Sequence, residues 1–581
     1  MSYRKAKTSP KQFEVDPKKL KNIVLSTMSR VAQAVGSSMG PGGKISLIES
    51  DLPGIPNRLT KDGVSIFKSL GAVNAYEHLI IETARDASTR TAEDAGDGTT
   101  TSAVLSYEII KNLFKFCEEN PKYSPQKASR RIAKITKDVL VPYIQSRAIM
   151  IDDENRDLLR SVAKISANGD DDLADAVIEA FETVGYGASS HVTIREVPGP
   201  SGYKVELIEG LPVPIGYEDS LRAQAVRFIN DSANQRVFLK SVRFILFDGA
   251  LNDLNPAMNL IEAIGTRYAQ VPGGDKNFEN FVIIAHGFSE SVINALAANF
   301  ESESSFNLVP IITPMAQFVN SQTHFLHDVA AFTGSKVFGL KDQMQNATLE
   351  DLGIPMESFD YGRFRSTILG DSDPTLVEMR ADDLRTLVKT AESQAEKSWI
   401  EERIAKITNG IAKLTVMGGS SGEMKEKVDR VDDAVAAVRS AITRGALPGG
   451  CRIAIDMVLK LQEELPEGDP ALAVLVPALF SLPHRILDNA GHTEEEIKEV
   501  INTLILNRDK VYDIENLVYG TAEELGLFDA TAAVQESLVN AVSIANVLGT
   551  MGAIVCHPRD PAFERSEAAA DADFYRVTGD Q

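Results

Sequence analysis

Apolar residues recur with the spacing of an α-helix towards both ends of the chain. Residues 18–147 follow this pattern, and the chain returns to it from residue 428 onward. The first stretch is interrupted over residues 40–65, where 44–48 and 65–66 are predicted to form short strands around a connection rich in glycine and proline. The two ends of the chain therefore share one helical texture.

The middle of the chain has a different texture. Between residues 210 and 410, apolar runs at 244–247, 281–285 and 308–312 are each followed by a helical stretch. Short continuous apolar runs that alternate with helices are typical of buried parallel strands in βα units. The pattern predicts an α/β block inserted into a helical body, so that the body is a discontinuous domain.

Two shorter segments, residues 149–208 and 411–444, separate the insert from the body. Gly210, Gly410 and Gly445 stand where the texture changes. Glycine tolerates large changes in φ and ψ, so these positions suit hinges, although structural turns use glycine at least as often.

Composition narrows the class of protein. The 581 residues are enough for roughly two to four domains. Hydrophobic residues make up 43% and charged residues 24%, as expected of a globular protein. The 82 acidic and 60 basic residues give a formal net charge of −22 without a long basic run, which argues against a nucleic-acid partner. The tail, residues 559–581, is rich in alanine and aspartate and is predicted to be disordered.

The sequence also disfavours several kinds of site and location. Cys117, Cys451 and Cys556 are too widely spaced for a disulfide framework or a Cys-x-x-Cys metal site. Residues 1–22 carry charges throughout and lack the apolar core of a signal peptide. No uninterrupted apolar run approaches the roughly 18 residues of a membrane span. We therefore expect a cytoplasmic protein with no membrane partner.

The most suggestive motif is Ala-Gly-Asp-Gly-Thr-Thr-Thr at residues 95–101, between predicted helices at 78–94 and 103–114. Free N–H groups and the positive end of the helix dipole favour a phosphate there, and Asp97 offers a hard oxygen to Mg²⁺. Taken alone, such a motif is more often a helix junction in which the aspartate is a turn or N-cap residue.

Three further motifs are ordinary when each is taken alone. The Gly-Pro-Gly-Gly-Lys run at 40–44 fails the Walker pattern, because Ser38 and Ile45 stand where glycine and Ser/Thr are needed. A glycine-rich turn can still present backbone amides to phosphate. The Asp-Gly pair in 60–64 suits a turn between strands, and the acidic pair in 431–435 suits a solvated helix face. The failed Walker pattern also disfavours a small-molecule kinase.

Taken together and in this order, the motifs resemble the nucleotide site of the chaperonins. The resemblance runs from about residue 18 to 555, nearly the whole chain. The matching segments are residues 38–41, 60–65, 95–101, 165–168, 347–353, 423–427, 430–434, 449–450 and 526–529. The Ala-Thr-Leu-Glu-Asp-Leu-Gly run at 347–353 and an insert without a long lid segment resemble the group I, GroEL-type branch.

The resemblance implies a ring-forming, ATP-driven folding machine with an α+β multidomain chaperonin fold. The mostly α equatorial domain, which binds ATP, would comprise residues 1–148 and 445–581. A small α/β intermediate hinge domain would comprise residues 149–208 and 411–444. The inserted α/β apical domain, which binds clients, would comprise residues 209–410.

The resemblance also implies roles for individual residues. Asp97 would bind Mg²⁺, Asp62 would act in catalysis near the γ-phosphate, and Asp433 would be a catalytic carboxylate that swings in from the intermediate domain. Hydrolysis would then wait for domain closure, and K⁺ is expected beside the phosphates. The remaining ATP-binding positions are Ser38 (threonine in the usual pattern), Met39, Gly40, Pro41, Lys61, Gly98, Thr99, Thr100, Thr101, Ser166, Gly450, Leu527 and Asp529, the last through the ribose hydroxyls.

The client groove implied by the resemblance is apolar, and it ordinarily docks a co-chaperonin lid as well. Its positions here are Tyr217, Leu221, Met258, Ile261, Ile293, Ala297 and Ala298. Arg222 stands where an aromatic residue is usual, and the two alanines replace larger aliphatic residues. A smaller apolar patch weakens capture by about 25 cal/mol per Å² lost, so use of a lid stays open. The rival explanation is a locally wrong alignment.

Two other departures from the family pattern concern assembly. The insert is longer than usual around residues 271–276 and 359–373. The segment 483–496, which resembles the ring-to-ring contact region, is slightly shorter and has Thr493 where glutamate is common. A homo-oligomeric, seven-membered ring is implied, either single or double. Such divergence suits a phage-encoded or otherwise specialised chaperonin, which would act in the host cytoplasm.

Two functions follow from the resemblance. The first is an ATP-hydrolysing chaperonin that encloses or binds non-native proteins and assists their folding. The alternative is a ring-shaped holdase or scaffold with weak or uncoupled ATPase activity. Retention of Asp62, Asp97 and Asp433 favours the first, because a passive scaffold needs none of them.

Overall fold

Contacts between residues divide the chain into two compact units. Unit 1 comprises Met1–Glu179, Ile194–Lys204 and Thr415–Gln581, and unit 2 comprises Ala180–Thr193 and Val205–Leu414. The division into three domains stays a prediction. The computed structural model describes residues 11–557 except 50–57, 96–97, 187–191, 214, 218–220, 222–223, 225–226, 232–235, 270–279, 302–305, 316–317, 319, 340–343, 363–365, 392 and 420. The expected disordered tail and the longer stretch at 271–276 lie outside these residues.

Unit 1 is built mainly from helices. They are α1 (Pro17–Gly36), α2 (Gly63–Ser69), α3 (Ala75–Ala95), α4 (Thr99–Glu119), α5 (Pro125–Ile135), α6 (Val141–Arg147), α7 (Asp157–Ser166), α15 (Ser421–Arg444), α16 (Arg452–Glu464), α17 (Pro470–Asn489), α18 (Glu494–Leu506), α19 (Ala522–Leu525) and α20 (Thr531–Thr550). Several begin with the same local chemistry: Asp16 and Asp469 accept hydrogen bonds from backbone N–H groups at the start of α1 and α17, each just before a proline. The helical periodicity at both ends of the chain is confirmed.

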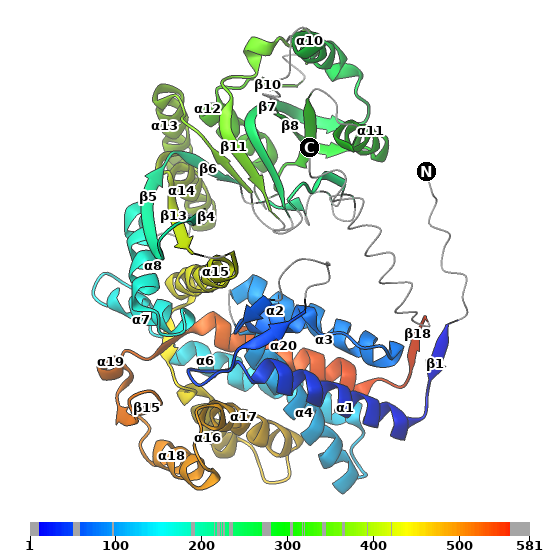
Figure 1. Cartoon of the computed structure of the whole chain (residues 1–581), viewed down its shortest axis with the longest axis vertical. Helices are drawn as coiled ribbons and strands as arrows, with labels where there is room; N and C mark the ends of the chain where they lie inside the picture. The colour runs from blue at the N-terminus through cyan, green and yellow to red at the C-terminus, as the bar shows by residue number, and fades with distance from the viewer. Residues whose placement is uncertain are drawn as a thin grey trace. The chain divides into compact units, whose positions relative to one another are not determined.

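Helices from the two ends of the chain share the core of unit 1. Helix α4 packs against α1, α17 and α20 (Figure 1). Its buried residues Ile110 and Leu113 lie in one hydrophobic cluster with Leu479 of α17 and Ala541 of α20. The start of α4 is thereby fixed by segments that are more than three hundred residues away in the sequence.

Helix α17 is a core helix of unusual apolarity. Among the described residues it is the one helix whose length and composition would allow it to cross a membrane, and half of its most apolar window is buried. It packs against α4, α5, α16 and α18, and Val474 and Leu479 are buried in the core of unit 1. Sequence analysis did not single out this helix, because Ser481, His484 and Arg485 interrupt its apolar residues.

Short antiparallel ribbons complete unit 1. They are β1 (Gln12–Glu14) with β18 (Ile554–Cys556), β2 (Ser46–Ile48) with β3 (Arg58–Thr60), β14 (Ala446–Pro448) with β17 (Phe528–Ala530), and β15 (Val511–Asp513) with β16 (Val518–Gly520). The strand predicted at 65–66 is wrong. These residues lie in α2, because both oxygens of Asp62 accept hydrogen bonds from the backbone N–H groups of Val64 and Ser65 and start a helix there.

Unit 2 contains a mixed sheet with the order β6-β12-β11-β7-β8-β9, and β10 also pairs with β7. Its strands are β6 (Gly210–Val213), β7 (Val237–Leu251), β8 (Asn280–Phe288), β9 (Asn307–Ile312), β10 (Val337–Phe338), β11 (Met356–Tyr361) and β12 (Ser366–Leu369). Strands β7, β8, β9 and β10 run parallel, so the predicted βα units are confirmed. The longer stretch at 359–373 contains the β11–β12 hairpin, whose Phe359 and Ile368 are buried.

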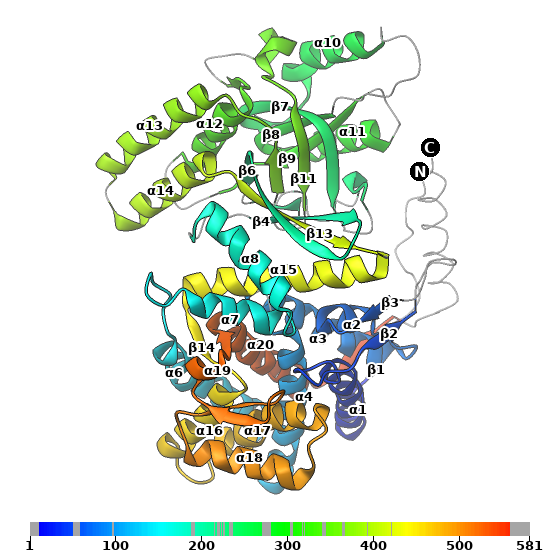
Figure 2. The ribbon, with the colours of Figure 1, turned by 60° about the vertical axis from the view of Figure 1, so that its left-hand side comes forward.

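Unit 2 also contains helices. They are α10 (Met258–Ala269), α11 (Glu290–Glu301), α12 (Ser321–Thr333), α13 (Pro374–Thr390) and α14 (Gln394–Thr408). Helix α11 contacts β9, whereas α12 contacts β7 and β10 (Figure 2). The remaining elements, α8 (Asp171–Val184), β4 (Val192–Pro198), β5 (Gly202–Ile208) and β13 (Ile411–Gly418), contain residues of both units, and the three strands form one sheet. Gly410 and Gly445 have positive φ values of 72° and 81°, whereas Gly210 is a strand residue.

Candidate active site

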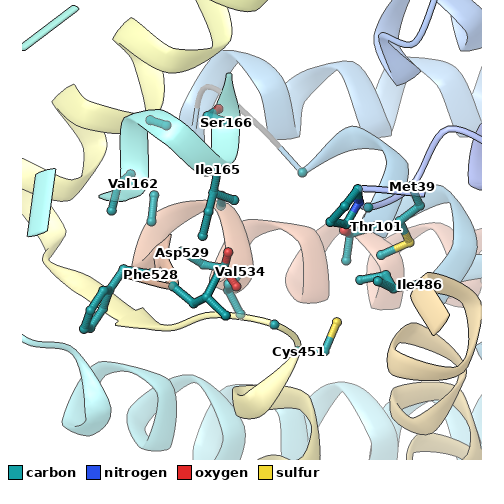
Figure 3. Close-up of a pocket in the computed structure, with 18 of the residues that line it drawn as sticks. Met39, Thr101, Val162, Ile165, Ser166, Cys451, Ile486, Phe528, Asp529 and Val534 are labelled. Carbon is teal, nitrogen blue, oxygen red and sulfur yellow. The ribbon is translucent and has the colours of Figure 1, made fainter. Parts of the chain in front are cut away.

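A cavity of about 710 Å³ lies within unit 1, and segments from both ends of the chain line it. On one side Val162 and Ile165 project from α7 on the side of Asp529, and Ser166 stands at the end of the same helix (Figure 3). On the other side lie Met39, Thr101 and Ile486. A cavity of this volume suits a ligand the size of a small cofactor.

The start of α4 forms one wall of the cavity. Gly98 is its N-cap residue with φ of 101°, and no side chain caps the helix there. The N–H groups of the first turn, Thr99 to Thr101, point out of the helix end without an intrahelical acceptor. Together with the helix dipole and the threonine hydroxyls, they form a wall that favours a phosphate.

Asp62 and the start of α2 stand beside this wall. Its Oδ1 accepts from Val64 N at 2.9 Å and its Oδ2 accepts from Ser65 N at 2.8 Å, while its own N–H donates to Thr60 Oγ1 at 3.0 Å. Gly63 follows, and a Cβ atom there would lie 1.9 Å from Thr100 Oγ1. A side chain at position 63 would therefore force the Thr100 hydroxyl to move from where it stands in the cavity wall.

The turn after α1 forms a second wall, with Ser38, Met39, Gly40 and Pro41 facing the cavity. Gly40 has φ of 76°, and a Cβ atom there would lie 2.8 Å from Cγ2 of Ile486. A positive φ and this close approach both require glycine. The Gly-Pro-Gly-Gly run thus serves a turn that is docked on α17.

Asp433 reaches the cavity from α15. The neighbouring Val431 and Ala434 are buried, Asp432 is exposed and does not line the cavity, and Asp433 is half-buried at its edge. The predicted acidic pair is thus divided between solvent and site. Contacts place α15 in unit 1, so this structure already holds Asp433 at the cavity.

The far end of the cavity is formed around Gly450, Cys451 and Asp529. Gly450 and Cys451 both have positive φ, at 62° and 61°, and they lie opposite β17, which carries Asp529. Burial raises the pKa of the Cys451 thiol, and the nearby Asp529 carboxylate raises it further. The thiol therefore stays neutral, which makes it a poor metal ligand.

The structure brings together almost all of the predicted nucleotide and catalytic positions. Those that line the cavity are Ser38, Met39, Gly40, Pro41, Lys61, Asp62, Gly98, Thr99, Thr100, Thr101, Ser166, Asp433, Gly450, Leu527 and Asp529. Asp97, the predicted metal ligand, lies outside the described residues.

The predicted client-binding positions are not gathered on one open surface. Tyr217, Leu221, Ile293 and Ala297 are buried in the core of unit 2, and Ile261 packs partly buried against it. Their apolar side chains therefore contribute to the hydrophobic core of unit 2. Met258 and Ala298 are exposed.

The donor set suits Mg²⁺ held mainly by phosphates. Asp62 and Asp433 supply carboxylates and the α4 threonines supply hydroxyls, all hard oxygen donors. Over the part of the chain that the structure describes, no three His, Cys, Asp or Glu side chains form a metal cage. Mg²⁺ ordinarily needs only one or two protein carboxylates beside phosphate oxygens, so these residues fit the ion.

Several lining residues were missed by sequence reasoning. They are Arg160 and Lys164 on α7, Cys451, Tyr512 of β15 and Ser537 of α20. Ser537 donates to Gly98 O at 3.0 Å, across 439 residues of sequence. Local pattern carries no information about such contacts, and only helical spacing on α7 could have placed Arg160 and Lys164 on the face of Ser161 and Ile165.

Comparisons with known proteins agree on one family. The model of the TCP-1/cpn60 chaperonin family matches residues 31–257 and 322–557. The chaperonin GroEL of Neorickettsia risticii is 27% identical over 550 residues, which cover 93% of this chain and 94% of its own. The mitochondrial chaperonin CPN60 of Euglena gracilis is 28% identical over 561 residues, which cover 93% of this chain and 91% of its own.

A solved structure supports the same fold. The chaperonin gp146 from bacteriophage EL 2 (Pseudomonas aeruginosa), crystallised in the presence of ATP-BeFx, superimposes with a TM-score of 0.67. It is 22% identical, and the match covers 95% of this chain and 99% of that chain. With the family model matching well over half of the sequence, the chain belongs to the TCP-1/cpn60 chaperonin family, as a divergent GroEL-type member.

Proposed function

We propose that this protein binds Mg-ATP in the cavity of unit 1 and hydrolyses it to assist the folding of non-native proteins. Its family consists of ATP-dependent chaperonins that form oligomeric rings. The observation that carries the proposal is the convergence of four helix or turn segments on one cavity: the turn at 38–41, the starts of α2 and α4, and Asp433 of α15.

The cavity offers different chemistry at its two ends. The start of α4 supplies N–H groups and hydroxyls, the turn at 38–41 supplies the N–H group of Gly40, and Lys61 supplies a cation, a set that would bind phosphates. Ile165, Leu527 and Gly450 line the other end, whose apolar and backbone surface suits a planar base. Asp529 lies at this same end, where a carboxylate would accept hydrogen bonds from ribose hydroxyls.

Asp62 and Asp433 are the candidates for catalysis. Hydrolysis of the γ-phosphate needs a group that orients the attacking water and accepts its proton. Asp62 is held in place by two backbone N–H donors, whereas Asp433 enters from another helix. We assign Asp433 the water and Asp62 a place beside the γ-phosphate, with bound Mg²⁺ neutralising phosphate charge and K⁺ beside the turn at 38–41.

The test is a steady-state ATPase assay on the purified protein, with and without Mg²⁺ and with and without an unfolded client. We expect turnover that requires Mg²⁺ and changes when client is added. Tight ATP binding without turnover would instead identify a holdase. Absence of ATP binding would refute the proposal altogether.

Ring assembly is supported by two apolar ribbons of unit 1. Phe13 of β1 and Val555 of β18 are exposed on one ribbon, and Leu47 of β2 and Leu59 of β3 are exposed on the other. Each ribbon has only two strands among the described residues, so its outer edges can pair further. We propose that the two ribbons join neighbouring subunits of the ring.

A further inference from the structure

The last residue of α17, Asn489, is tied to the turn that lines the cavity. Its Nδ2 group donates to Gly36 O and to Met39 O, each at 2.9 Å. Gly36 is the last residue of α1, and Met39 lies in the turn that follows. One side-chain amide therefore uses both of its N–H groups to bridge a helix end and the turn.

These two hydrogen bonds determine which side of the turn faces the cavity. Ser38, Met39, Gly40 and Pro41 all line it. The carbonyls of Gly36 and Met39 are directed to Asn489, and carbonyl oxygens directed at a phosphate would repel it. Within the turn, Ser38 N donates to Val35 O, Met39 N donates to Gly36 O, and Pro41 has no N–H group. Because Asn489 holds the two carbonyls away, the N–H group of Gly40 is the backbone donor of residues 38–41 left to meet an anion.

The turn also docks on the end of α17 without spare room. A Cβ atom on Gly42 would lie 2.5 Å from Cα of Ala490 and 2.7 Å from the carbonyl oxygen of Asn489. A Cβ atom on Gly40 would meet Ile486, whose side chain lies beside Met39 and Thr101 in the cavity (Figure 3). Hydrogen bonding and close packing thus place the turn at the same spot.

We propose that Asn489 is a positioning residue for nucleotide binding, which acts by fixing the turn at 38–41 in the conformation that receives the phosphates. The proposal rests on the proposed function, because it concerns the same cavity. Asn489 itself does not line the cavity, so its effect on nucleotide passes through the backbone of Gly36 and Met39.

The test compares Asn489→Asp with a matched control, Asn120→Asp. Asn120 also ends a helix, is also half-buried and also donates through Nδ2 to a backbone carbonyl, that of Phe116 at 3.0 Å, but it lies away from the cavity. In Asn489→Asp the two donors become carboxylate oxygens, which repel the two carbonyls. We expect ADP and ATP to bind roughly tenfold more weakly, which corresponds to the loss of about one hydrogen-bonded restraint.

Binding is measured by isothermal titration calorimetry with ADP, next to the melting temperature without nucleotide. A structural role alone would lower the melting temperature of both variants and leave the affinity of the folded protein unchanged. Our proposal requires a loss of affinity in Asn489→Asp that Asn120→Asp does not share. Wild-type affinity in Asn489→Asp would overturn it and leave the proposed function standing.

A second variant keeps the inference testable should Asn489→Asp fold poorly. In Gly42→Ala the added methyl group would collide with the backbone of Asn489 and Ala490 and push the turn away from α17, while the Asn489 side chain is unchanged. It should therefore weaken ADP binding similarly. Unchanged affinity in Gly42→Ala would count against the inference. The wild type is titrated in the same series, and a wild type that binds no nucleotide refutes the proposed function and this inference together.

Discussion

At the residue scale, Asp62 combines two tasks in one carboxylate. Both of its oxygens accept hydrogen bonds from the first turn of α2. Each carboxylate oxygen has a further lone pair, so the capped side chain can still accept from a water or hold a metal. The same carboxylate therefore caps α2 and faces the cavity. A substitution can remove its charge from the cavity while keeping part of the cap.

Asp62→Asn should separate structure from chemistry. Asparagine keeps one oxygen that can cap a backbone N–H group of α2, but its NH2 group cannot accept from the other, so α2 should still form with a slightly lower melting temperature. The charge is lost, however, and kcat for ATP should fall by about 10²-fold, the ordinary contribution of a positioned acid–base group. An ATPase assay at saturating ATP checks this, and a variant with wild-type kcat would exclude Asp62 from catalysis.

Asp433→Ala should bind ATP and yet hydrolyse it far more slowly, by about 10²–10⁴-fold, because the attacking water loses its base. Single-turnover hydrolysis with bound ATP gives the rate directly. Asp432→Ala is the control, since Asp432 lies on the same helix but is exposed and does not line the cavity. Undiminished single-turnover hydrolysis in Asp433→Ala would refute the role.

At this scale, the sequence predicted those site residues that lie in short motifs and missed those that depend on contacts between distant segments. The residues around Asp62, Gly98 and Asp433 lie in short motifs that match the chaperonin pattern in order, so the resemblance could predict their meeting in one cavity. Asn489 and its acceptor Gly36 are 453 residues apart, and no local pattern announces their contact. Tyr217 and Ile293 show a second limitation. Aligning a motif with a family pattern does not say whether an apolar side chain faces the core or the solvent, and both of these side chains are buried in the core.

At the element scale, a buried ion cluster links three helices of unit 2. Asp328 of α12 accepts from Nε of Arg380 on α13 at 2.8 Å and from Nε of Arg403 on α14 at 2.7 Å. Both arginines also donate to the backbone carbonyl of His324, and Arg403 lies over the ring of Trp399. The last two helices of unit 2, α13 and α14, are thus both bonded to Asp328.

Asp328→Ala should destabilise unit 2 strongly. It leaves two largely buried guanidinium groups without their carboxylate, and breaking a buried pair in this way costs about 3–5 kcal/mol. Denaturant unfolding followed by the fluorescence of Trp399, the only tryptophan in the chain, reports on this region. Arg385→Ala, which removes an exposed ion pair on α13, is the control and should leave the midpoint unchanged.

Helices and strands were predictable where the spacing of apolar residues alone distinguishes one from the other. The parallel strands β7, β8 and β9 each contain a continuous apolar run that is buried on both faces, at 244–246, 281–285 and 308–311, and these runs marked their positions. Residues 65–66, which lie in α2, were predicted as a strand. A stretch of two residues is too short to show whether its apolar positions follow the spacing of a helix or of a strand. The helix begins there because the side chain of Asp62 caps it, and the spacing of apolar residues carries no information about a capping side chain.

At the scale of the whole molecule, the exposed ribbons of unit 1 make assembly testable. Leu47→Asp places a charge on a side chain that is 68% exposed on the β2–β3 ribbon. We expect the monomer to keep its fold and the assembled species to be lost, which mass photometry or analytical ultracentrifugation would show. Met379→Asp, at a residue 62% exposed on α13, is the control and should assemble normally. Intact rings in Leu47→Asp would place the subunit contact elsewhere.

The use of both chain ends in the cavity has a consequence for synthesis on the ribosome. Residues 205–414 of unit 2 are translated before α16, α17 and α20 exist. Helices α1 and α4 emerge first, but the apolar faces that they later bury against α17 and α20 must wait for more than three hundred further residues. The cavity of unit 1 is therefore incomplete until Asp529 and Ser537 leave the exit tunnel. Until then this chain is itself an incompletely folded protein with exposed apolar helices, the kind of molecule on which its family acts.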